Sequence, residues 1–351
     1  MFDTLVGNER AKETLRRMLG QGRVPSALLF AGEEGLGKKL FALELARALN
    51  CRSRRGVEAC GVCPACARVG RIQYPAAAEK DEHKRIAWSE HKDVGLVVPY
   101  NRNILVDAVR DLERESNFRP VEGSARVFII EQAECLNPPA ANKDSAANAL
   151  LKTLEEPPPT THIVLITSRP AGLLPTIRSR CQTVRFAPLA ADELESHLVK
   201  SGKRAGEEAR LAAQLSSGRP GVALGLNLDD YRQRRDAMFG VVEALASGGD
   251  RVRLLRAAEE LGDAKNKDEY EPRLDALEIL VRDLWLLSLG GGDGRLVNGD
   301  LRERLARLAS GVPPARASRW LLRIEELRGQ LAVNVNRRAA TDALFLTMSA
   351  D

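Results

Sequence analysis

The sequence predicts an α/β domain built on a parallel sheet with helices on both faces, followed by an all-helical region. The main observation is that three short apolar stretches, residues 26–32, 125–134 and 161–170, alternate with stretches of helical periodicity. Strands that alternate with helices pair in parallel, and helices then cover both faces of the sheet. The second observation is that strand-like patterns stop near residue 190, and helical patterns follow from there.

The predicted helices show an apolar face or a clear stop signal. Residues 9–20 predict an amphipathic helix that closes at Gly20, and residues 39–49 continue as a helix directly after a glycine-rich loop. Within residues 146–159, apolar side chains recur at helical spacing before three prolines end the helix. Ligands of such sheets bind at the carboxyl ends of the strands, so we expect the site there.

Length and composition set limits on the class of protein. The chain has 351 residues, which suggests two or three domains. A formal net charge of +5 neither demands nor excludes nucleic acid as a partner. No apolar run approaches the ~18 residues of a membrane helix, and the first residues lack the pattern of a signal peptide. We therefore expect a cytoplasmic location and no membrane partner.

The glycine-rich loop fits the phosphate-loop pattern G-x-x-x-x-G-K. Because it lies between a predicted strand and a predicted helix, we interpret Gly32, Gly35, Gly37 and Lys38 as a phosphate loop rather than a tight turn with two solvated lysines. The next residue should be Ser or Thr, whose hydroxyl holds Mg²⁺. It is Lys39, which argues against ATP hydrolysis and leaves ATP binding open.

The second predicted strand ends where such folds carry the acidic pair Asp-Glu. Here the pair is Glu131-Gln132. Glu131 keeps a carboxylate on a longer side chain, whereas Gln132 can orient a water molecule but cannot take its proton. The simpler alternative is a strand end with ordinary polar residues.

Four of the six cysteines form the pattern C-x₈-C-x₂-C-x₂-C, namely Cys51, Cys60, Cys63 and Cys66. Four thiolates suit tetrahedral Zn²⁺, and each C-x₂-C step offers two ligands from one turn of backbone. With no open ligand position, the predicted site is structural. The alternative is four free thiols in a polar loop, and Cys135 is expected to be a small core residue.

A basic segment follows the third predicted strand. Arg178-Ser179-Arg180-Cys181 offers guanidinium groups that suit phosphate. Taken alone, a solvated basic loop is the simpler interpretation, because paired surface arginines are common.

Together, these features resemble the bacterial clamp-loader subunits of DNA polymerase III, which belong to the AAA+ superfamily. The resemblance is carried by the phosphate loop, the four cysteines, the stretch NALLKTLEEPP, the Ser179-Arg180-Cys181 triplet and, near the end, NVNRRAATDALFLTM. It covers the whole chain. Residues 1–187 match the nucleotide-fold domain with its zinc module, residues 188–229 the helical lid, and residues 230–351 the helical collar.

The resemblance implies a role and partners. Arg180 would act as an arginine finger in trans, at the ATP of a neighbouring subunit. The chain would join gamma/tau and delta subunits in a hetero-pentamer that loads the sliding clamp onto primed DNA, as part of the polymerase III holoenzyme. By itself it would not polymerise DNA.

Within this family, the residues favour delta-prime members over the ATP-hydrolysing gamma/tau members. Gamma/tau needs the hydroxyl after the lysine, the Asp-Glu pair and a lid arginine. This chain has Lys39, then Glu131-Gln132, and Gly221-Val222 where the arginine is sought.

Two rival classes remain at this stage. One is an active ATPase of the gamma/tau type, which ATP turnover would reveal. The other is a stand-alone zinc-containing DNA-binding protein, although the cysteines lack the His ligands of a base-reading finger.

Overall fold

The computed structural model describes residues 1–351 except 138–145, 249, 264–266, 292–295 and 332–335. The chain forms two compact units, Met1–Gly225 and Leu226–Asp351. The first contains the predicted nucleotide fold together with residues 188–225 of the predicted lid, and residues 226–229 belong to the second. The finer division of the chain into three domains stays a prediction.

The first unit is built on a six-stranded sheet in the order β2-β3-β4-β5-β1-β6. All neighbouring strands pair in parallel except β2, which pairs antiparallel with β3 at the edge. The predicted fold class is confirmed. The strands are β1 (Ala27–Ala31), β2 (Ala87–Trp88), β3 (Val94–Val97), β4 (Arg126–Ile130), β5 (Thr161–Thr167) and β6 (Gln182–Arg185).

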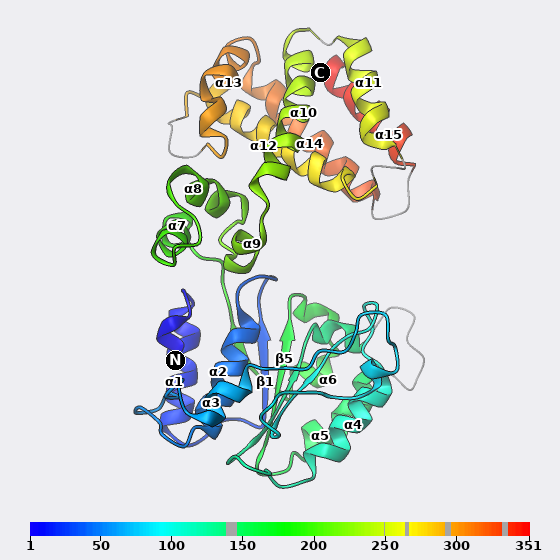
Figure 1. Cartoon of the computed structure of the whole chain (residues 1–351). Helices are drawn as coiled ribbons and strands as arrows, with labels where there is room; N and C mark the ends of the chain where they lie inside the picture. The colour runs from blue at the N-terminus through cyan, green and yellow to red at the C-terminus, as the bar shows by residue number, and fades with distance from the viewer. Residues whose placement is uncertain (138–145, 249, 264–266, 292–295, 332–335) are drawn as a thin grey trace. The chain divides into compact units, whose positions relative to one another are not determined.

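Helices cover both faces of this sheet, and each face has its own apolar core (Figure 1). Side chains alternate along β1, so Leu28 and Phe30 lie in one core while Leu29 lies in the other. Full burial of a side chain of this size stabilises a fold by about 1.5–3 kcal/mol. The first core includes α1 (Glu9–Gly20) and α2 (Lys38–Asn50); the second includes α4 (Val106–Ser116) and α5 (Ala146–Glu155).

The sequence patterns missed three strands and extended a fourth. Strand β3 has four residues including Gly95, β2 has two, and in β6 only Val184 is buried. None therefore forms an apolar run long enough to recognise. The predicted strand over 125–134 ends at Ile130, because the chain turns at Gln132, with φ of 45°, into the short helix η3 (Ala133–Leu136).

Shorter helices complete the first unit. The predicted short helices after the sheet are present as α7, α8 and α9, and two further helices border the predicted sites. Their bounds are α3 (Pro64–Val69), α6 (Pro175–Arg178), α7 (Ala191–Lys200), α8 (Gly206–Leu215) and α9 (Pro220–Gly225).

The second unit is helical in all its described parts. The apolar face predicted in α12 is buried, with Leu277, Leu280, Val281 and Leu284 all fully covered. Among the described residues, no helix is long and apolar enough to cross a membrane. The long helices are α10 (Leu228–Ala246), α11 (Arg251–Gly262), α12 (Tyr270–Ser288), α13 (Arg302–Ala309), α14 (Pro314–Leu331) and α15 (Arg337–Ala350).

The last helix is anchored by an indole. Trp320 of α14 is fully buried, and its Nε1–H donates to the carbonyl oxygen of Met348 over 2.7 Å. The motif NVNRRAATDALFLTM falls on this helix, except that its first two residues, 334 and 335, lie outside the described residues.

Candidate functional site

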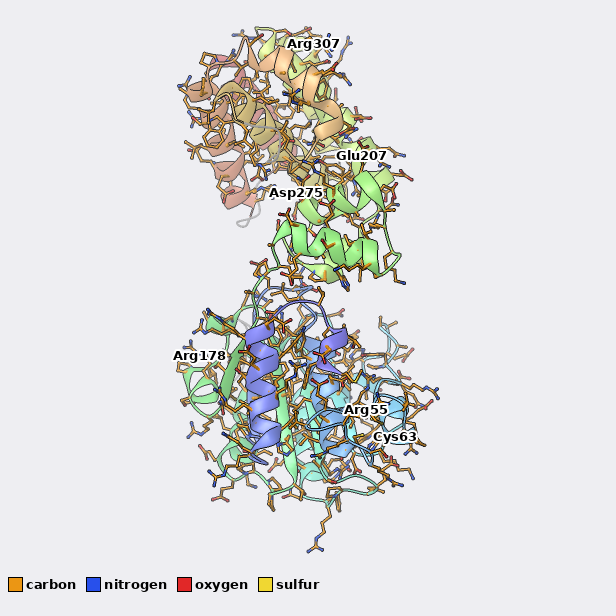
Figure 2. The ribbon with its side chains drawn as sticks, turned by 90° about the vertical axis from the view of Figure 1, so that its left-hand side faces the viewer. Arg55, Cys63, Arg178, Glu207, Asp275 and Arg307 are labelled. Atoms are coloured by element: carbon orange, nitrogen blue, oxygen red, sulfur yellow. The ribbon has the colours of Figure 1, made fainter. Side chains whose placement is uncertain are left out.

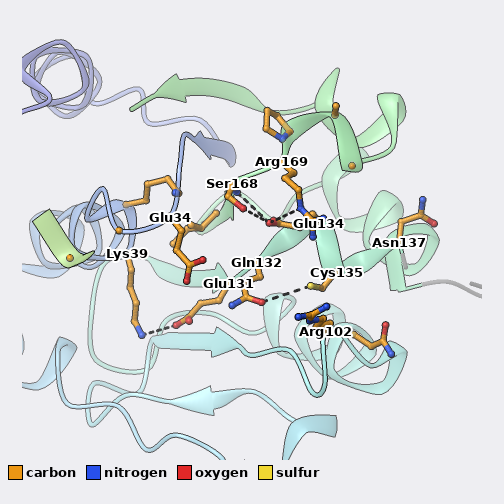
Figure 3. A pocket seen from close by; sticks show the side chains of 18 of the residues that line it. Glu34, Lys39, Arg102, Glu131, Gln132, Glu134, Cys135, Asn137, Ser168 and Arg169 are labelled. Atoms are coloured by element: carbon orange, nitrogen blue, oxygen red, sulfur yellow. Dashed lines mark hydrogen bonds and ion pairs between the residues drawn. The ribbon is translucent and has the colours of Figure 1, made fainter. Parts of the chain in front are cut away.

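A pocket of about 1440 Å³ lies at the carboxyl ends of the parallel strands (Figure 3). It brings together the phosphate loop, the residues after β4 and the residues after β5. These segments are far apart in sequence, and parallel pairing places their strand ends at one edge. Predicted residues in its lining are Gly35, Gly37, Lys38, Lys39, Glu131 and Gln132; Glu34, Glu134, Ser168, Arg169 and Gly221 line it as well.

The loop has the backbone of an anion-binding turn. Gly35 and Gly37 adopt φ of 83° and 81°, a left-handed conformation that favours glycine. The loop leads directly into α2, whose N-terminus presents unpaired backbone N–H groups. Lys38, however, is folded back, and its ammonium donates to the carbonyl oxygens of Gly32 and Glu33. Burial lowers the pKa of Lys38, against the attraction of Glu134.

Lys39 occupies the position next to the acidic strand end. Its Nζ lies 2.8 Å from Oε1 of Glu131 (Figure 3). The same Nζ lies 4.3 Å from the ring centre of Tyr74. Burial alone lowers the pKa of Lys39, but the interactions with Glu131 and Tyr74 together outweigh burial and hold the pKa above its ordinary value. The ammonium stays charged and is paired within the chain.

The side chain of Gln132 is exposed in the pocket, and its amide cannot act as a general base. Its Oε1 accepts from the thiol of Cys135, 3.9 Å away (Figure 3). Cys135 itself is buried in the core, as predicted.

Glu134, the buried carboxylate of this pocket, was not among the predicted site residues. Its two oxygens accept from the hydroxyls of Thr167 and Ser168, each over 2.7 Å. Burial raises its pKa, but these hydrogen bonds outweigh burial and hold the pKa of Glu134 below its usual range. The signal was available as the second acidic residue of the stretch EQAE, one turn beyond Glu131.

The helix α9 packs on the phosphate loop. The backbone N–H of Gly221 donates to the carbonyl oxygen of Gly35 over 2.8 Å. A Cβ at Gly221 would lie 3.1 Å from that same oxygen, and a Cβ at Gly35 would lie 2.9 Å from Val222. An arginine at position 221 would therefore push the two segments apart.

The four predicted cysteines come together at the other end of α2. Cys51 follows the last residue of this helix, and Cys63 caps the start of α3. The four sulfur atoms lie within 4.8 Å of one another, and the closest pairs are 3.9 and 4.0 Å apart. A tetrahedral Zn²⁺ with four thiolates has sulfur–sulfur edges of about 3.8 Å. The cluster can hold a metal ion of this kind.

Backbone donors support thiolates in this cluster. The N–H groups of Cys60, Cys63 and Cys66 point at the sulfurs of Cys51, Cys60 and Cys63 over 3.3 to 3.5 Å. Burial raises the pKa of Cys63, but backbone donors from Cys66 and Arg52 contribute to lowering it to about 6. Burial raises the pKa of Cys66, which a bound cation would have to overcome.

Arg180 lies just after α6, on the surface. Its side chain is 35% exposed, and its guanidinium pairs with Oε1 of Glu155 over 2.6 Å and donates to the carbonyl oxygen of Thr176 over 2.9 Å. The neighbouring Cys181 is buried in the core, where burial raises its thiol pKa to about 11. In Figure 2, Cys63 and Arg178 lie on opposite sides of α1, so the cysteine cluster and the arginine segment are separate.

Comparisons with known proteins agree with this architecture. A family model described as "DNA polymerase III, delta subunit" matches residues 7–190. The DNA polymerase III subunit delta' of Bacillus subtilis is 29% identical over 97% of this chain and 95% of its own length. That of Escherichia coli is 30% identical over 93% of this chain and 89% of its own.

A longer relative matches over part of its length. The DNA polymerase III subunit tau of Salmonella typhimurium is 28% identical over 74% of this chain, but over only 36% of its own length. The family model spans the phosphate loop, the four cysteines and the Arg180 segment, and the two delta' proteins match over nearly the whole chain. This chain therefore belongs to the family of DNA polymerase III delta' subunits.

Proposed function

We propose that this chain is a clamp-loader subunit that helps ATP-driven loading of the sliding clamp onto primed DNA without hydrolysing ATP itself. Its likeness to delta' subunits over nearly the whole chain supports this role. Its partners are then gamma/tau and delta subunits in a hetero-pentameric ring, joined through the helices of residues 230–351. Such a role belongs in the cytoplasm.

The observation that carries the proposal is the ion pair between Lys39 and Glu131. A hydrolysing site needs a hydroxyl and a carboxylate free to hold Mg²⁺. Here an ammonium replaces the hydroxyl and engages the carboxylate at 2.8 Å. A cation that belongs to the chain thus stands where the metal would be held, and it has no oxygen to offer.

Two further features act in the same direction. Gln132 presents an amide, which cannot accept the proton of an attacking water. No arginine stands at Gly221 beside the phosphate loop, and a Cβ there would lie 3.1 Å from the carbonyl oxygen of Gly35, so a larger residue requires the two segments to shift. ATP binding, if any, rests on the loop and the start of α2.

A stator-like role fits the contact between α9 and the phosphate loop. Gly221 and Gly35 are joined by a backbone hydrogen bond of 2.8 Å. We infer that residues 188–229 stay docked on the loop while neighbouring subunits cycle through ATP.

We assign to Arg180 a role in ATP hydrolysis at the active site of an adjacent subunit. This arginine is exposed, and its pair with Glu155 lies on the surface, where such pairs contribute only about 0–1 kcal/mol. A triphosphate bound by an adjacent subunit can therefore displace Glu155. The four cysteines, by contrast, hold a structural Zn²⁺ in our proposal and take no part in the reaction.

The isolated chain tests the first half of the proposal. Purified protein should release no phosphate from ATP above background, even with excess Mg²⁺. The matched control is Lys38→Ala, which removes the phosphate-loop ammonium. Turnover by the wild type that Lys38→Ala abolishes would instead establish an active ATPase of the gamma/tau type.

Reconstitution with the partner subunits tests the second half. Arg180→Ala should leave the chain folded and able to assemble, and it should reduce ATP hydrolysis by the complex. A single arginine finger contributes about 10³–10⁵ in rate, but the loss in a complex with several active sites is smaller because only one site is affected. Arg178→Ala is the matched control. Equal hydrolysis by the two variant complexes would refute the assignment.

A further inference from the structure

We propose that an arginine-rich face around the four cysteines binds the phosphodiester backbone of nucleic acid. This basic face consists of Arg52, Arg54, Arg55, Lys92 and Arg119, all of which are exposed. It is separate from the nucleotide pocket, because α2 has 13 residues and so places about 20 Å between Lys38 and Cys51. The proposal does not depend on the function proposed above.

The cysteine segment is unusually basic for a chain of modest net charge. Residues 51–74 contain five arginines and a single acidic residue, Glu58. That carboxylate is already used, since Oε1 lies 2.6 Å from Arg16 and Oε2 accepts from the backbone N–H of Phe2. The segment therefore presents a positive surface that its own acidic residue does not neutralise.

The cations of the basic face have no carboxylate partners in the described part of the chain. The guanidinium of Arg52 donates to the carbonyl oxygen of Glu122 over 3.4 Å, and that of Arg54 donates to Leu49 over 2.8 Å. The side chains of Arg55, Lys92 and Arg119 make no ion pair among the described residues. These groups remain available to an external anion.

Glu122 draws the separate parts of the face together. Its carboxylate pairs with Arg68 of α3 over 2.6 Å and accepts from the backbone N–H of Lys92 over 2.9 Å. The cysteine segment, the turn before β3 and the loop before β4 thus meet at one residue. Figure 2 shows Arg55 beside Cys63 on this side of the unit.

The loop that carries Arg119 is held by buried side chains. Asp93 is fully buried, and its carboxylate accepts from the backbone N–H groups of Val121, Glu122 and Gly123 over 2.6 to 2.9 Å. Asn50, at the end of α2, accepts from the next two N–H groups over 2.9 and 3.0 Å. A loop fixed in this way loses little freedom when a ligand binds it.

A simpler interpretation is that the arginines only offset the negative charge of a metal–thiolate cluster. Four thiolates around Zn²⁺ carry a charge of −2, which leaves about +3 from the five cations of the face. In the described residues, however, the sulfurs accept from backbone N–H groups, and no guanidinium donates to them. The arginines point to carbonyl oxygens and to solvent instead.

Nucleic acid fits the face better than an acidic protein because of one aromatic side chain. Phe118 is 56% exposed and immediately precedes Arg119. An exposed ring beside basic groups can stack on a base while the cations contact phosphates. Single strands and duplexes share this backbone chemistry, so both are tested.

The experiment is fluorescence anisotropy of the full-length, metal-loaded chain with a labelled oligonucleotide, single-stranded in one arm and duplex in the other. We expect Kd values of about 10⁻⁴–10⁻⁶ M that weaken as salt rises. The double variant Arg54→Glu/Arg55→Glu should weaken binding at least tenfold. Loss of two phosphate contacts should also reduce the salt slope by about 1.4 for single strands and 1.8 for duplexes.

Matched variants separate this proposal from its alternatives. Lys200→Glu/Lys203→Glu makes the same charge change on exposed residues of α7 and the following turn, and it should bind like the wild type. Phe118→Ala should weaken the single strand more than the duplex. If the charge reversal Arg54→Glu/Arg55→Glu lowers the metal content, the double variant Lys92→Glu/Arg119→Glu is used instead. Neither of these two residues lies in the cysteine segment.

Two results would overturn the proposal. One is equal oligonucleotide binding by the basic-face variants and the α7 control. The other is preferential binding of a polyglutamate probe, lost in the basic-face variants, which would mark the face as a site for acidic proteins.

Discussion

The two ends of α2 carry sites with opposite outcomes. Its C-terminal end leads into four cysteines whose sulfurs all lie within 4.8 Å of one another, a complete ligand set for a metal ion. Its N-terminal end carries a phosphate loop in which Lys38 bonds to the loop itself and Lys39 pairs with Glu131. The first site offers four sulfur ligands to a cation from solution. At the second site the cation is the ammonium of Lys39, which belongs to the chain.

This difference is what the proposed function predicts for the two sites. A structural metal adds directly to the stability of the chain that holds it, so every ligand must remain. A nucleotide site serves a reaction, and under the proposed function the neighbouring subunits carry out that reaction, so this chain needs only the fold. Gly35 and Gly37 illustrate this, since their backbone shape persists without the hydroxyl and the base.

The largest effect should follow from breaking the complete site. Cys63→Ser should abolish stoichiometric metal binding, because structural Zn²⁺ needs all four ligands and its binding is worth about 10–16 kcal/mol in small domains. Metal analysis should give about one zinc per wild-type chain and far less in the variant. Limited proteolysis should then cut within residues 51–74.

Cys181→Ala is the control for this experiment, because that thiol is buried in the core away from the cluster. It should keep its zinc and its protease resistance. Wild-type protein that is free of zinc yet equally resistant in residues 51–74 would contradict the prediction.

The sequence predicted the complete site better than the altered one, for a physical reason. Ligand spacing in a metal cluster is local, so Cys60, Cys63 and Cys66 are recognisable from a few residues. The pocket is assembled from the ends of β1, β4 and β5, which are not adjacent in sequence, and its contacts depend on how side chains turn. That Lys39 reaches Glu131, or that Glu134 bonds to Thr167, does not follow from a pattern.

The sequence predicted three strands of the sheet, β1, β4 and β5, and did not predict β2, β3 and β6. The strands β1, β4 and β5 are apolar runs in the middle of the sheet and were recognised. The outer strands β2 and β6 are short or polar on their exposed sides, because an edge position buries fewer side chains. Such strands are specified by their neighbours in the sheet more than by their own composition.

A moderate effect should follow from removing the buried carboxylate of the pocket. Glu134→Gln should lower the free energy of unfolding of the first unit by about 1–3 kcal/mol at neutral pH, since it replaces charge-assisted hydrogen bonds. The folded-state pKa of Glu134 is lowered. Its contribution is therefore present above the ordinary Glu pKa and is lost as the pH falls through the folded value.

Urea unfolding of the wild type and of Glu134→Gln, at pH 7 and in acid, measures this difference in the free energy of unfolding. The gap between wild type and variant should be widest at pH 7 and should narrow in acid. Glu33→Gln is the control, because that side chain is 59% exposed and should change stability little. A gap that stays constant with pH would show that Glu134 contributes shape and not charge.

The smallest effect should come from returning a hydroxyl to the altered site. Lys39→Thr removes the ammonium from Glu131 and restores an oxygen that Mg²⁺ can bind. It should nevertheless give no ATP turnover above background, because Gln132 still cannot accept the proton of water and no arginine stands at position 221. Lys39→Met is the matched variant, since it removes the same half-buried ion pair and adds no hydroxyl. Phosphate release by both variants, measured with and without Mg²⁺, should equal that of the wild type.

Turnover in Lys39→Thr that is absent in Lys39→Met and is abolished by adding Lys38→Ala would mean that the hydroxyl alone was missing. The pocket would then have to be regarded as an intact nucleotide site that only the side chain of Lys39 inactivates.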